Sequence, residues 1–253
     1  MLAHIKYVQN FPVMSIDEYG LCSEGAYTIS GWVNGNALEK ALKKSNKEKE
    51  YQLGESAGVL LKSLHDNNPS CATESNAWQR EFSVFMDSKI KEYLKCGIRF
   101  EGDEAIIKYL SDNRFLLLDR PMCLIHGDLT LANIMIQREG GGLFLVDVDS
   151  IRHGDPYFDL RQLAIGECRP IFNTGFINGY TSCSPDNSLW ELLRFYCCVA
   201  SLHMVSKCSK KRPGQAEYAL QYIEKHIATF CNSNQLYPTW YLGEANNCLK
   251  TLV

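Results

Sequence analysis

The stretch from His126 to Asp159 constrains the fold of this 253-residue chain more than any other part of the sequence. It contains two short apolar runs, Asn133 to Gln137 and Leu143 to Val148, on either side of an Arg-Glu-Gly-Gly-Gly segment. Short β-type runs that flank a glycine-rich turn are typical of an antiparallel hairpin. The sequence therefore predicts a β-hairpin in the middle of the chain, with polar residues at its open end.

The segments on both sides of this hairpin show the apolar spacing of helices. Before the hairpin, the pattern predicts helices at 54–66, 77–94 and 103–110. After the hairpin, it predicts helices at 158–165, 172–180, 188–204 and 216–230. Nearer the N-terminus, residues 26–33 favour a strand that turns at Asn34-Gly35 into a helix with Asn36 as its N-cap. We therefore expect an α+β fold that is mostly helical around a small sheet.

Composition and charge argue against several classes of protein. The net charge of -3 gives no global electrostatic reason to bind nucleic acid or an anionic membrane. Eleven cysteines are scattered without a CxxC pair, which favours a reduced cytoplasmic setting over disulfides or structural zinc. The N-terminus lacks the apolar core of a signal peptide, and the most apolar stretch, Phe195 to Val205, is too short to span a bilayer. We expect a cytoplasmic protein with no nucleic-acid or membrane partner.

Three oxygen-bearing residues lie at the ends of the predicted strands. Asp128 and Asn133 precede the first strand and Asp147 lies near the end of the second, so the hairpin brings them together. Transfer of a phosphoryl group needs a carboxylate that orients the attacking hydroxyl, and oxygen ligands that hold magnesium against the phosphates. Asp128 suits the first role, and Asn133 and Asp147 suit the second. If the strand continues, Asp149 lies on the face of Asp147 and is a candidate further ligand, although capping of the following turn is an equal alternative.

Three motifs resemble those of the aminoglycoside phosphotransferase and choline kinase group, which has the protein-kinase-like fold: HGDLTLAN, LVDVDS and DPYFDL. The resemblance implies that Asp128 is the catalytic aspartate and that Asn133 and Asp147 bind Mg²⁺ next to the nucleotide. It also implies that Asp159 is a buried aspartate that supports the catalytic loop. His126 is expected to be structural, since a histidine beside a loop can anchor the backbone by hydrogen bonds.

Two features favour a small-molecule acceptor over a polypeptide. Gly127 stands where protein kinases have the arginine of the HRD motif, which would bind an activation-loop phosphate. Only Asp149 to Gly154 separates the predicted metal-binding strand from Asp155-Pro156, which leaves no long activation segment to seat a peptide. The expected reaction is transfer of the γ-phosphoryl group of ATP or GTP to a hydroxyl of an aminoglycoside-like compound, an amino-alcohol or a sugar.

The N-terminal lobe of such an enzyme is expected to be incomplete in this chain. Only 26 residues precede Tyr27, and neither a phosphate loop nor a strand lysine can be placed among them. Either sequence upstream of Met1 is missing or the protein has lost that half. We expect residues 1–33 to form a remnant of the N-terminal lobe with the hinge, and residues 34–253 to form the helical C-terminal lobe. Apolar surface left uncovered in this way would favour self-association.

Two alternatives to an active phosphotransferase follow from the short N-terminus. The chain could be a catalytically inactive, kinase-like binding or regulatory protein, or an inactive fragment that lacks the phosphate-binding lobe. Retention of Asp128, Asn133 and Asp147 argues against the first, because a protein freed from catalysis has no need for three oxygen ligands in one place. The aromatic segment Tyr237 to Tyr241 could line an acceptor pocket or pack in the core, and His65 is expected to be a packing residue at a helix end.

Overall fold

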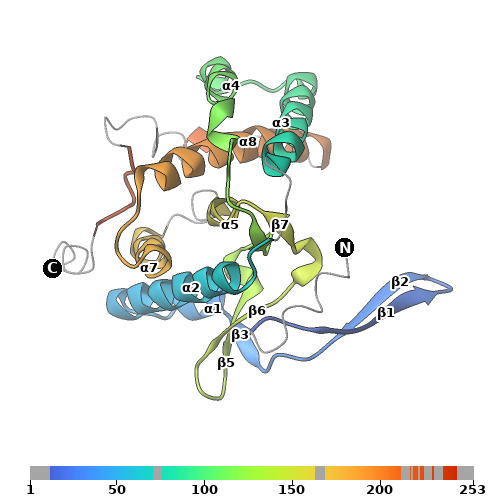
Figure 1. The fold of residues 1–253 in the computed structure, drawn as a ribbon, viewed down its shortest axis with the longest axis vertical. Coiled ribbons are helices and arrows are strands. Elements are labelled where there is room, and N and C mark those ends of the chain that lie inside the picture. Colours follow the sequence, from blue (N-terminus) through green and yellow to red (C-terminus); the bar gives the residue numbers. More distant parts are fainter. Residues whose placement is uncertain are drawn as a thin grey trace.

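Helices form most of the structure, and short strands lie among them (Figure 1). The computed structural model describes residues 12–70, 76–162 and 169–211, together with 217, 219–221, 223, 224, 230 and 236–243. Within these described segments, no helix combines the length and the apolar character that crossing a lipid bilayer requires.

The first described element is a two-stranded antiparallel ribbon of β1 (Ile16–Cys22) and β2 (Gly25–Ser30). It projects away from the rest of the protein in Figure 1, and all six residues of β2 are exposed. The strand expected over 26–33 is therefore present, but it ends at Ser30.

The helix expected to be capped by Asn36 begins later in the chain. Asn36 lies within β3 (Gly35–Ala37), where it pairs with Ile136 of the hairpin, and α1 (Leu38–Leu42) follows with Ala37 at its N-cap. The prediction of Asn36 as an N-cap is thus wrong. Pairing with a strand about a hundred residues away holds this segment extended and overrides the local capping signal.

A three-stranded antiparallel sheet contains the predicted hairpin. Its strands are β5 (Ile134–Gln137) and β6 (Leu143–Leu145), with β3 added next to β5. The register pairs Ile134 with Leu145, so the residues just outside that pair, Asn133 and Val146, meet at the open end. The hairpin prediction is confirmed.

The second strand of the hairpin is shorter than expected. It ends at Leu145, because Asp147 has a left-handed backbone with φ of 61° and the chain continues as a 3-10 turn, Val148–Ser150. A left-handed residue cannot continue a strand ladder. The predicted extension of this strand to Val148 is therefore wrong.

The helices α2 (Lys47–Asn67) and α7 (Pro170–Thr181) cross with their backbones in close contact. Each presents a pair of glycines spaced four residues apart at the crossing: Gly54 and Gly58 on α2, Gly175 and Gly179 on α7. A Cβ atom at Gly58 would fall well inside contact distance of the carbonyl oxygen of Phe176. These two helices confirm the predictions over 54–66 and 172–180, and glycine is what lets them approach so closely.

A second group of helices comprises α3 (Ala77–Cys96), α4 (Asp103–Asp112) and α8 (Asn187–Lys211), which lie together at the top of Figure 1. They enclose aromatic side chains that include Trp78, Phe82, Tyr93 and Phe195, all almost fully buried. Their bounds confirm the helices expected over 77–94, 103–110 and 188–204.

Short elements connect these groups: 3-10 helices Arg114–Leu117 and Leu131–Asn133, the antiparallel pair β4 (Cys123–Ile125) and β7 (Arg152–Gly154), and helix α5 (Tyr157–Leu160). The helix expected over 158–165 thus starts with α5, but residues 163–168 lie outside the described part of the chain. Most of the helix expected over 216–230 also lies outside it. Trp240 is buried against Trp190, with ring centroids 6.3 Å apart, so this residue of the aromatic segment packs in the core, whereas Tyr237 is exposed.

Candidate active site

The loop between β4 and β5 carries the residues predicted to be catalytic. It runs from His126 to Asn133 and ends in a 3-10 turn. Gly127 has a φ of 82°, and a Cβ atom there would collide with the carbonyl oxygen of Ser150. Only glycine combines this backbone conformation with so close an approach. The conformation of the loop therefore requires glycine at position 127. The absence of the HRD arginine did not reveal this structural reason.

Asp159, fully buried on α5, holds this loop in place. Its Oδ2 accepts a hydrogen bond from the backbone N–H of His126 at 2.7 Å, and its Oδ1 accepts one from that of Gly127 at 2.8 Å. The Nε2 atom of His65, on α2, lies 3.2 Å from Oδ2. Burial alone would raise the pKa of Asp159, but the hydrogen bond to His65 and the positive charge nearby outweigh it and lower the pKa. Asp159 is therefore a charged acceptor for the loop backbone.

His126 connects the same loop to the end of the hairpin. Its Nδ1 accepts a long hydrogen bond, 3.4 Å, from the backbone N–H of Asp128. Its Nε2 lies 2.9 Å from the carbonyl oxygen of Val146, the residue before Asp147. These two contacts assign the ring proton to Nε2. Both nitrogens of this fully buried ring are used in binding backbone.

The Asp128 side chain is half-buried at the surface of the loop. Its Oδ1 lies 3.3 Å from the Nε2 atom of Gln162, which the sequence gave no reason to single out. The Nδ2 atom of Asn133 donates to the backbone carbonyl of Asp128 at 2.9 Å. Because the amide nitrogen of Asn133 is engaged in this way, its Oδ1 is the atom left to bind a ligand.

Asp147 lies next to Asn133 at the open end of the hairpin. The N–H of Val146 donates to the carbonyl oxygen of Asn133 at 3.0 Å, and Asp147 follows immediately. Its side chain is exposed and makes no hydrogen bond or ion pair with the described residues. The structure thus brings Asp128, Asn133 and Asp147 to one end of the hairpin, with an amide oxygen and a carboxylate unengaged.

This donor set suits magnesium, which prefers oxygen ligands and often takes only one or two from the protein, with phosphates and water completing its shell. Within the described segments, no group of three His, Cys, Asp or Glu side chains could hold a metal ion by itself. Asp149 is exposed in the 3-10 turn after Asp147, so the strand alternation expected to align these two carboxylates does not apply. A cation at this position would therefore depend on the oxygens of a bound phosphate.

Two further residues support the loop, and this role was not predicted from the sequence. Arg161 donates to the carbonyl oxygen of Gly127 at 2.7 Å, and its guanidinium lies 3.6 Å from the centroid of the Phe158 ring. His65 was expected only to pack, yet its Nδ1 also lies 2.9 Å from the hydroxyl of Tyr180. A signal for His65 existed, because it shares a helix face with buried leucines and a buried imidazole needs polar partners.

A second buried carboxylate, Asp155, holds the segment that leads from β7 into α5. The guanidinium of Arg120 donates to both of its oxygens, at 2.6 and 3.3 Å, and the hydroxyl of Tyr196 donates at 2.8 Å. Trp78 in turn donates to the hydroxyl of Tyr196 at 2.9 Å. This network joins α3 and α8 to the start of α5, and so positions the helix that carries Asp159.

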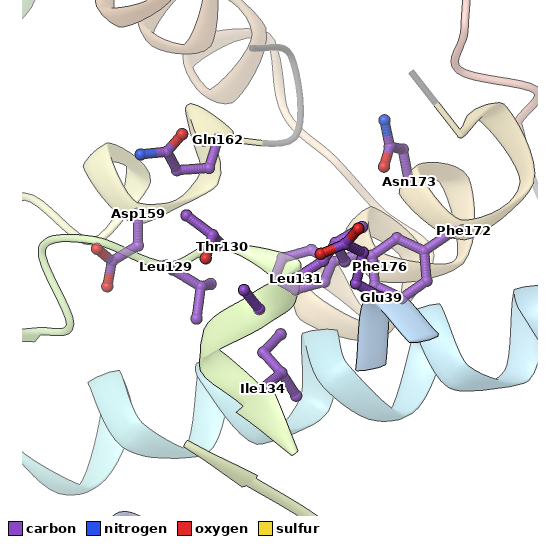
Figure 2. A pocket seen from close by; sticks show the side chains of 11 residues that line it. Glu39, Leu129, Thr130, Leu131, Ile134, Asp159, Gln162, Phe172, Asn173 and Phe176 are labelled. Carbon is purple, nitrogen blue, oxygen red and sulfur yellow. The ribbon is translucent and has the colours of Figure 1, made fainter. Parts of the chain in front are cut away.

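Two cavities adjoin the loop and share Gln162 in their walls. The first, about 200 Å³, lies between the loop, α1 and α7, where Figure 2 shows Glu39 beside Phe172 and Phe176. The second, about 390 Å³, lies among α3, α5 and α8 and has Asp128 in its wall. The second cavity therefore opens directly onto the carboxylate predicted to be catalytic.

Known proteins share this architecture. A model of the phosphotransferase enzyme family matches residues 13–196. The solved gentamicin–APH(2″)-IIa complex superposes with a TM-score of 0.61 at 14% identity, covering 88% of this chain and 78% of that one. The GDP complex of wild-type aminoglycoside 2′-phosphotransferase-IIIa gives 0.62 at 12% identity, with coverages of 90% and 79%. A choline/ethanolamine kinase family protein from Mesorhizobium loti gives 0.59 at 15% identity, with coverages of 84% and 73%. No curated protein matches the sequence significantly.

At such low identities the solved structures establish a shared fold. They confirm the expected α+β, protein-kinase-like architecture with a helical C-terminal lobe and a small β portion. They also confirm the resemblance to the aminoglycoside phosphotransferase and choline kinase group. Because the family model matches well over half of the sequence, the chain belongs to the phosphotransferase enzyme family.

Proposed function

We propose that this protein is a small-molecule kinase that transfers the γ-phosphoryl group of ATP or GTP to a hydroxyl. The observation that carries the proposal is the convergence of Asp128, Asn133 and Asp147 at the open end of the hairpin, on a loop that Asp159 holds. The Asp128 carboxylate orients the acceptor hydroxyl and takes its proton as the new oxygen–phosphorus bond forms. The bond to the leaving nucleoside diphosphate breaks in the same step.

Asn133 Oδ1 and the Asp147 carboxylate are the proposed ligands of Mg²⁺, which when bound would neutralise charge on the phosphates. Both groups are unengaged by protein, which supports this role. Asp149, in the adjoining turn, is a further candidate ligand. His126 and Asp159 support the loop through their hydrogen bonds to backbone.

Nucleotide use is supported by relatives solved with GDP and with ADP. A small-molecule acceptor is supported by relatives named for aminoglycosides or for choline and ethanolamine. It is also supported by the chain itself, since β7 follows the Val148–Ser150 turn almost at once and leaves no long segment to seat a peptide. Competition between ATP and GTP in a turnover assay would decide between the two nucleotides.

The test of this proposal is the variant Asp128→Asn, which keeps the size of the side chain and removes the base. Phosphorylation of a pool of aminoglycosides, amino-alcohols and sugars is expected to fall by about 10²- to 10⁴-fold, the usual contribution of a positioned base. Asp112→Asn, at the exposed end of α4, is the matched control and should retain the rate. Equal turnover in both variants, with both folded, would refute the role of Asp128.

A non-catalytic binding or regulatory protein is the second candidate. The observation that favours it is that neither β1 nor β2 contains a lysine, the residue that contacts the nucleotide phosphates in kinases. Thermal unfolding with Mg²⁺ and either nucleotide separates the candidates, because a ligand that binds only the folded state raises the midpoint. An enzyme should show a rise that Asp147→Ala abolishes. A chain that shows none at millimolar nucleotide fits the second candidate.

We further propose that residues 1–33 form a remnant of the N-terminal lobe with the hinge and residues 34–253 the helical C-terminal lobe. We also propose that the β1–β2 ribbon, with Trp32 just after it, is a surface for self-association. Leu21 and Trp32 are 86% and 92% exposed, and a two-stranded ribbon is only marginally stable in water. A second copy would cover these side chains. Sedimentation equilibrium should show a dimer that the double substitution Leu21→Ser and Trp32→Ser disrupts. Val84→Ser, exposed on α3, should leave the dimer unchanged; a wild-type monomer at all concentrations would contradict the proposal.

A further inference from the structure

The lining of the cavity that opens onto Asp128 indicates which chemical class of acceptor it binds. This inference rests on the proposed phosphotransferase function. It lies among α3, α5 and α8 and has a volume of about 390 Å³, enough for a molecule with one or two rings. Asp128 and Gln162 line the end nearest the loop. An acceptor whose hydroxyl reaches Asp128 would therefore place its remaining atoms in this cavity.

Most of the cavity wall is apolar. Phe82 and Phe85 contribute from α3, Phe158 from α5, and Val199 and Met204 from α8. Phe82 and Phe158 are almost fully buried and pack edge to face, with ring centroids 5.6 Å apart. Such a surface favours a ligand with an apolar body, because apolar area removed from water contributes roughly 25 cal/mol per Å².

The charged groups in the wall are mainly cationic. Arg161 and Lys207 line the cavity, and Asp128 is the one carboxylate among the described lining residues. The guanidinium of Arg161 donates to the carbonyl oxygens of Phe158 and Gly127, both at 2.7 Å, and forms no ion pair with a described carboxylate. Burial lowers the pKa of Arg161 to about 10, which still leaves it charged at neutral pH. Its charge interacts with the nearby carboxylates of Asp159 and Asp128 without a direct ion pair.

Two other groups in the wall, one charged and one polar, lack a partner among the described residues. Lys207 is exposed on α8 and forms no ion pair with the described residues. The Nδ1 atom of His203 is buried and has no hydrogen-bond partner among the described residues. Burial and the charge of Lys89 and other nearby lysines lower the pKa of His203, so the ring is neutral at pH 7. The electrostatic environment of the cavity thus favours a negative group on the ligand.

The aromatic faces are also poorly placed to bind a cationic ligand. Arg161 already covers the Phe158 ring at 3.6 Å from its centroid, and Lys89 lies 5.2 Å from that of Phe85. A ligand ammonium group would have to displace these cations or lie beside them, where like charges repel. The same repulsion would act on an aminoglycoside with several amino groups.

We propose that the cavity binds the acceptor and selects a hydroxyl compound with an apolar, ring-sized body and an anionic group, in preference to a polycationic sugar or an amino-alcohol. The hydroxyl lies toward Asp128, the body contacts the phenylalanines, and the anion lies toward Arg161 and Lys207. This selectivity differs from what the names of the superposed relatives suggest for those proteins.

The test uses three para-substituted benzyl alcohols that share the ring and hydroxyl and differ in charge: the carboxylate, the methyl and the aminomethyl compound. Binding to the full chain is measured by ligand-observed NMR titration without nucleotide. The carboxylate should bind most tightly and the aminomethyl compound least, with a ratio of dissociation constants of about tenfold or more, because two cations act with opposite sign on the two ligands.

A charge reversal at the rim provides the matched pair of variants. Lys207→Glu should weaken binding of the carboxylate by about three- to tenfold and strengthen binding of the aminomethyl compound. Lys91→Glu makes the same change in net charge at an exposed position of α3 outside this wall, and should leave both affinities unchanged. Since both lysines are exposed, neither variant threatens folding.

Three outcomes would overturn the proposal: tightest binding by the aminomethyl compound, equal affinities for all three, or no binding of any at millimolar concentration. None of these depends on turnover. If the aminomethyl compound binds best while Asp128→Asn still abolishes phosphorylation, the acceptor class is wrong and the phosphotransferase function stands. If the carboxylate binds best but Asp128→Asn leaves turnover unchanged, the function fails and the selectivity of the cavity stands.

Discussion

Replacing Asp159 by asparagine would remove one charge from the interior while keeping the shape of the side chain. Both carboxylate oxygens are used: Oδ1 binds the N–H of Gly127, and Oδ2 binds the N–H of His126 and lies against His65. Asparagine has only one acceptor oxygen. If that oxygen takes the place of Oδ2, the amide NH₂ faces the N–H of Gly127, and two donors confront each other in a site without solvent.

The expected cost follows from these contacts. The lost hydrogen bond to Gly127 was charge-assisted and contributes roughly 1.5–3 kcal/mol. The two remaining contacts fall to about half their strength once the acceptor is neutral. Relief of the desolvation of the carboxylate offsets part of this loss. We expect the free energy of unfolding to fall by about 3 kcal/mol, a large share of the roughly 5–15 kcal/mol typical of a folded protein.

Urea unfolding at pH 7, followed by circular dichroism, measures this loss as a fall of about 1 M or more in the midpoint. Asp149→Asn is the matched control, because Asp149 is exposed and makes no hydrogen bond or ion pair with a described residue; its effect should stay within about 0.5 kcal/mol. Equal midpoints for the two variants would refute the conclusion that Asp159 holds the loop.

The pH dependence gives a second, independent readout. The pKa of Asp159 is lower in the folded protein than its ordinary value of about 3.9. Its charge therefore stabilises the fold fully above about pH 4, and this contribution is lost as the pH falls through the folded value. The difference in stability between wild type and Asp159→Asn should be constant from pH 7 to 5 and should narrow below about pH 4. A difference that persists unchanged in acid would contradict this origin.

Three other predictions concern packing, a buried ion pair and a thiol. Gly58→Ala should lower the free energy of unfolding by about 1–3 kcal/mol in thermal melts, because the added Cβ collides with the backbone of α7. Gly31→Ala, whose added Cβ would have no neighbouring atom within 4 Å, should be neutral. Equal effects of the two substitutions would contradict the close crossing. Arg120→Met leaves the Asp155 carboxylate buried without its ion-pair partner and should cost about 3–5 kcal/mol in urea unfolding, and wild-type stability would count against that network. Burial raises the pKa of the Cys123 thiol, so peptide mass spectrometry should find it alkylated by iodoacetamide only after unfolding; rapid labelling of the native protein would show that it is accessible.

The hairpin and most helices could be predicted because their signals are local. Short apolar runs in β5 and β6, with a run of glycines between them, favour a hairpin whatever surrounds it. Such a hairpin necessarily brings Asn133 close to Asp147, so the proposed magnesium ligands were visible in the sequence. Helix bounds differed from expectation by up to seven residues, at the start of α2 and the end of α8, because apolar spacing does not mark where a helix begins or ends.

The errors arose where a distant segment or a single backbone angle decided the local conformation. Asn36 carried a good capping signal, yet pairing of β3 with β5 drew it into a strand. Asp149 was aligned with Asp147 only on the assumption of a continuous strand, which the left-handed backbone of Asp147 interrupts. In both cases the local pattern was correctly identified and a tertiary contact or a single backbone angle overrode it.

By itself, the sequence determined the fold class, the hairpin and the spacing of Asp128, Asn133 and Asp147, because each depends on residues close together in the chain. Only the tertiary structure decided how that loop is held and what lies beside it. His65 and Asp159 are 94 residues apart, and the cavity of Phe85, Arg161 and Lys207 draws on three segments. Contacts between segments so distant depend on how helices pack, and packing is a property of the whole chain that no local spacing encodes.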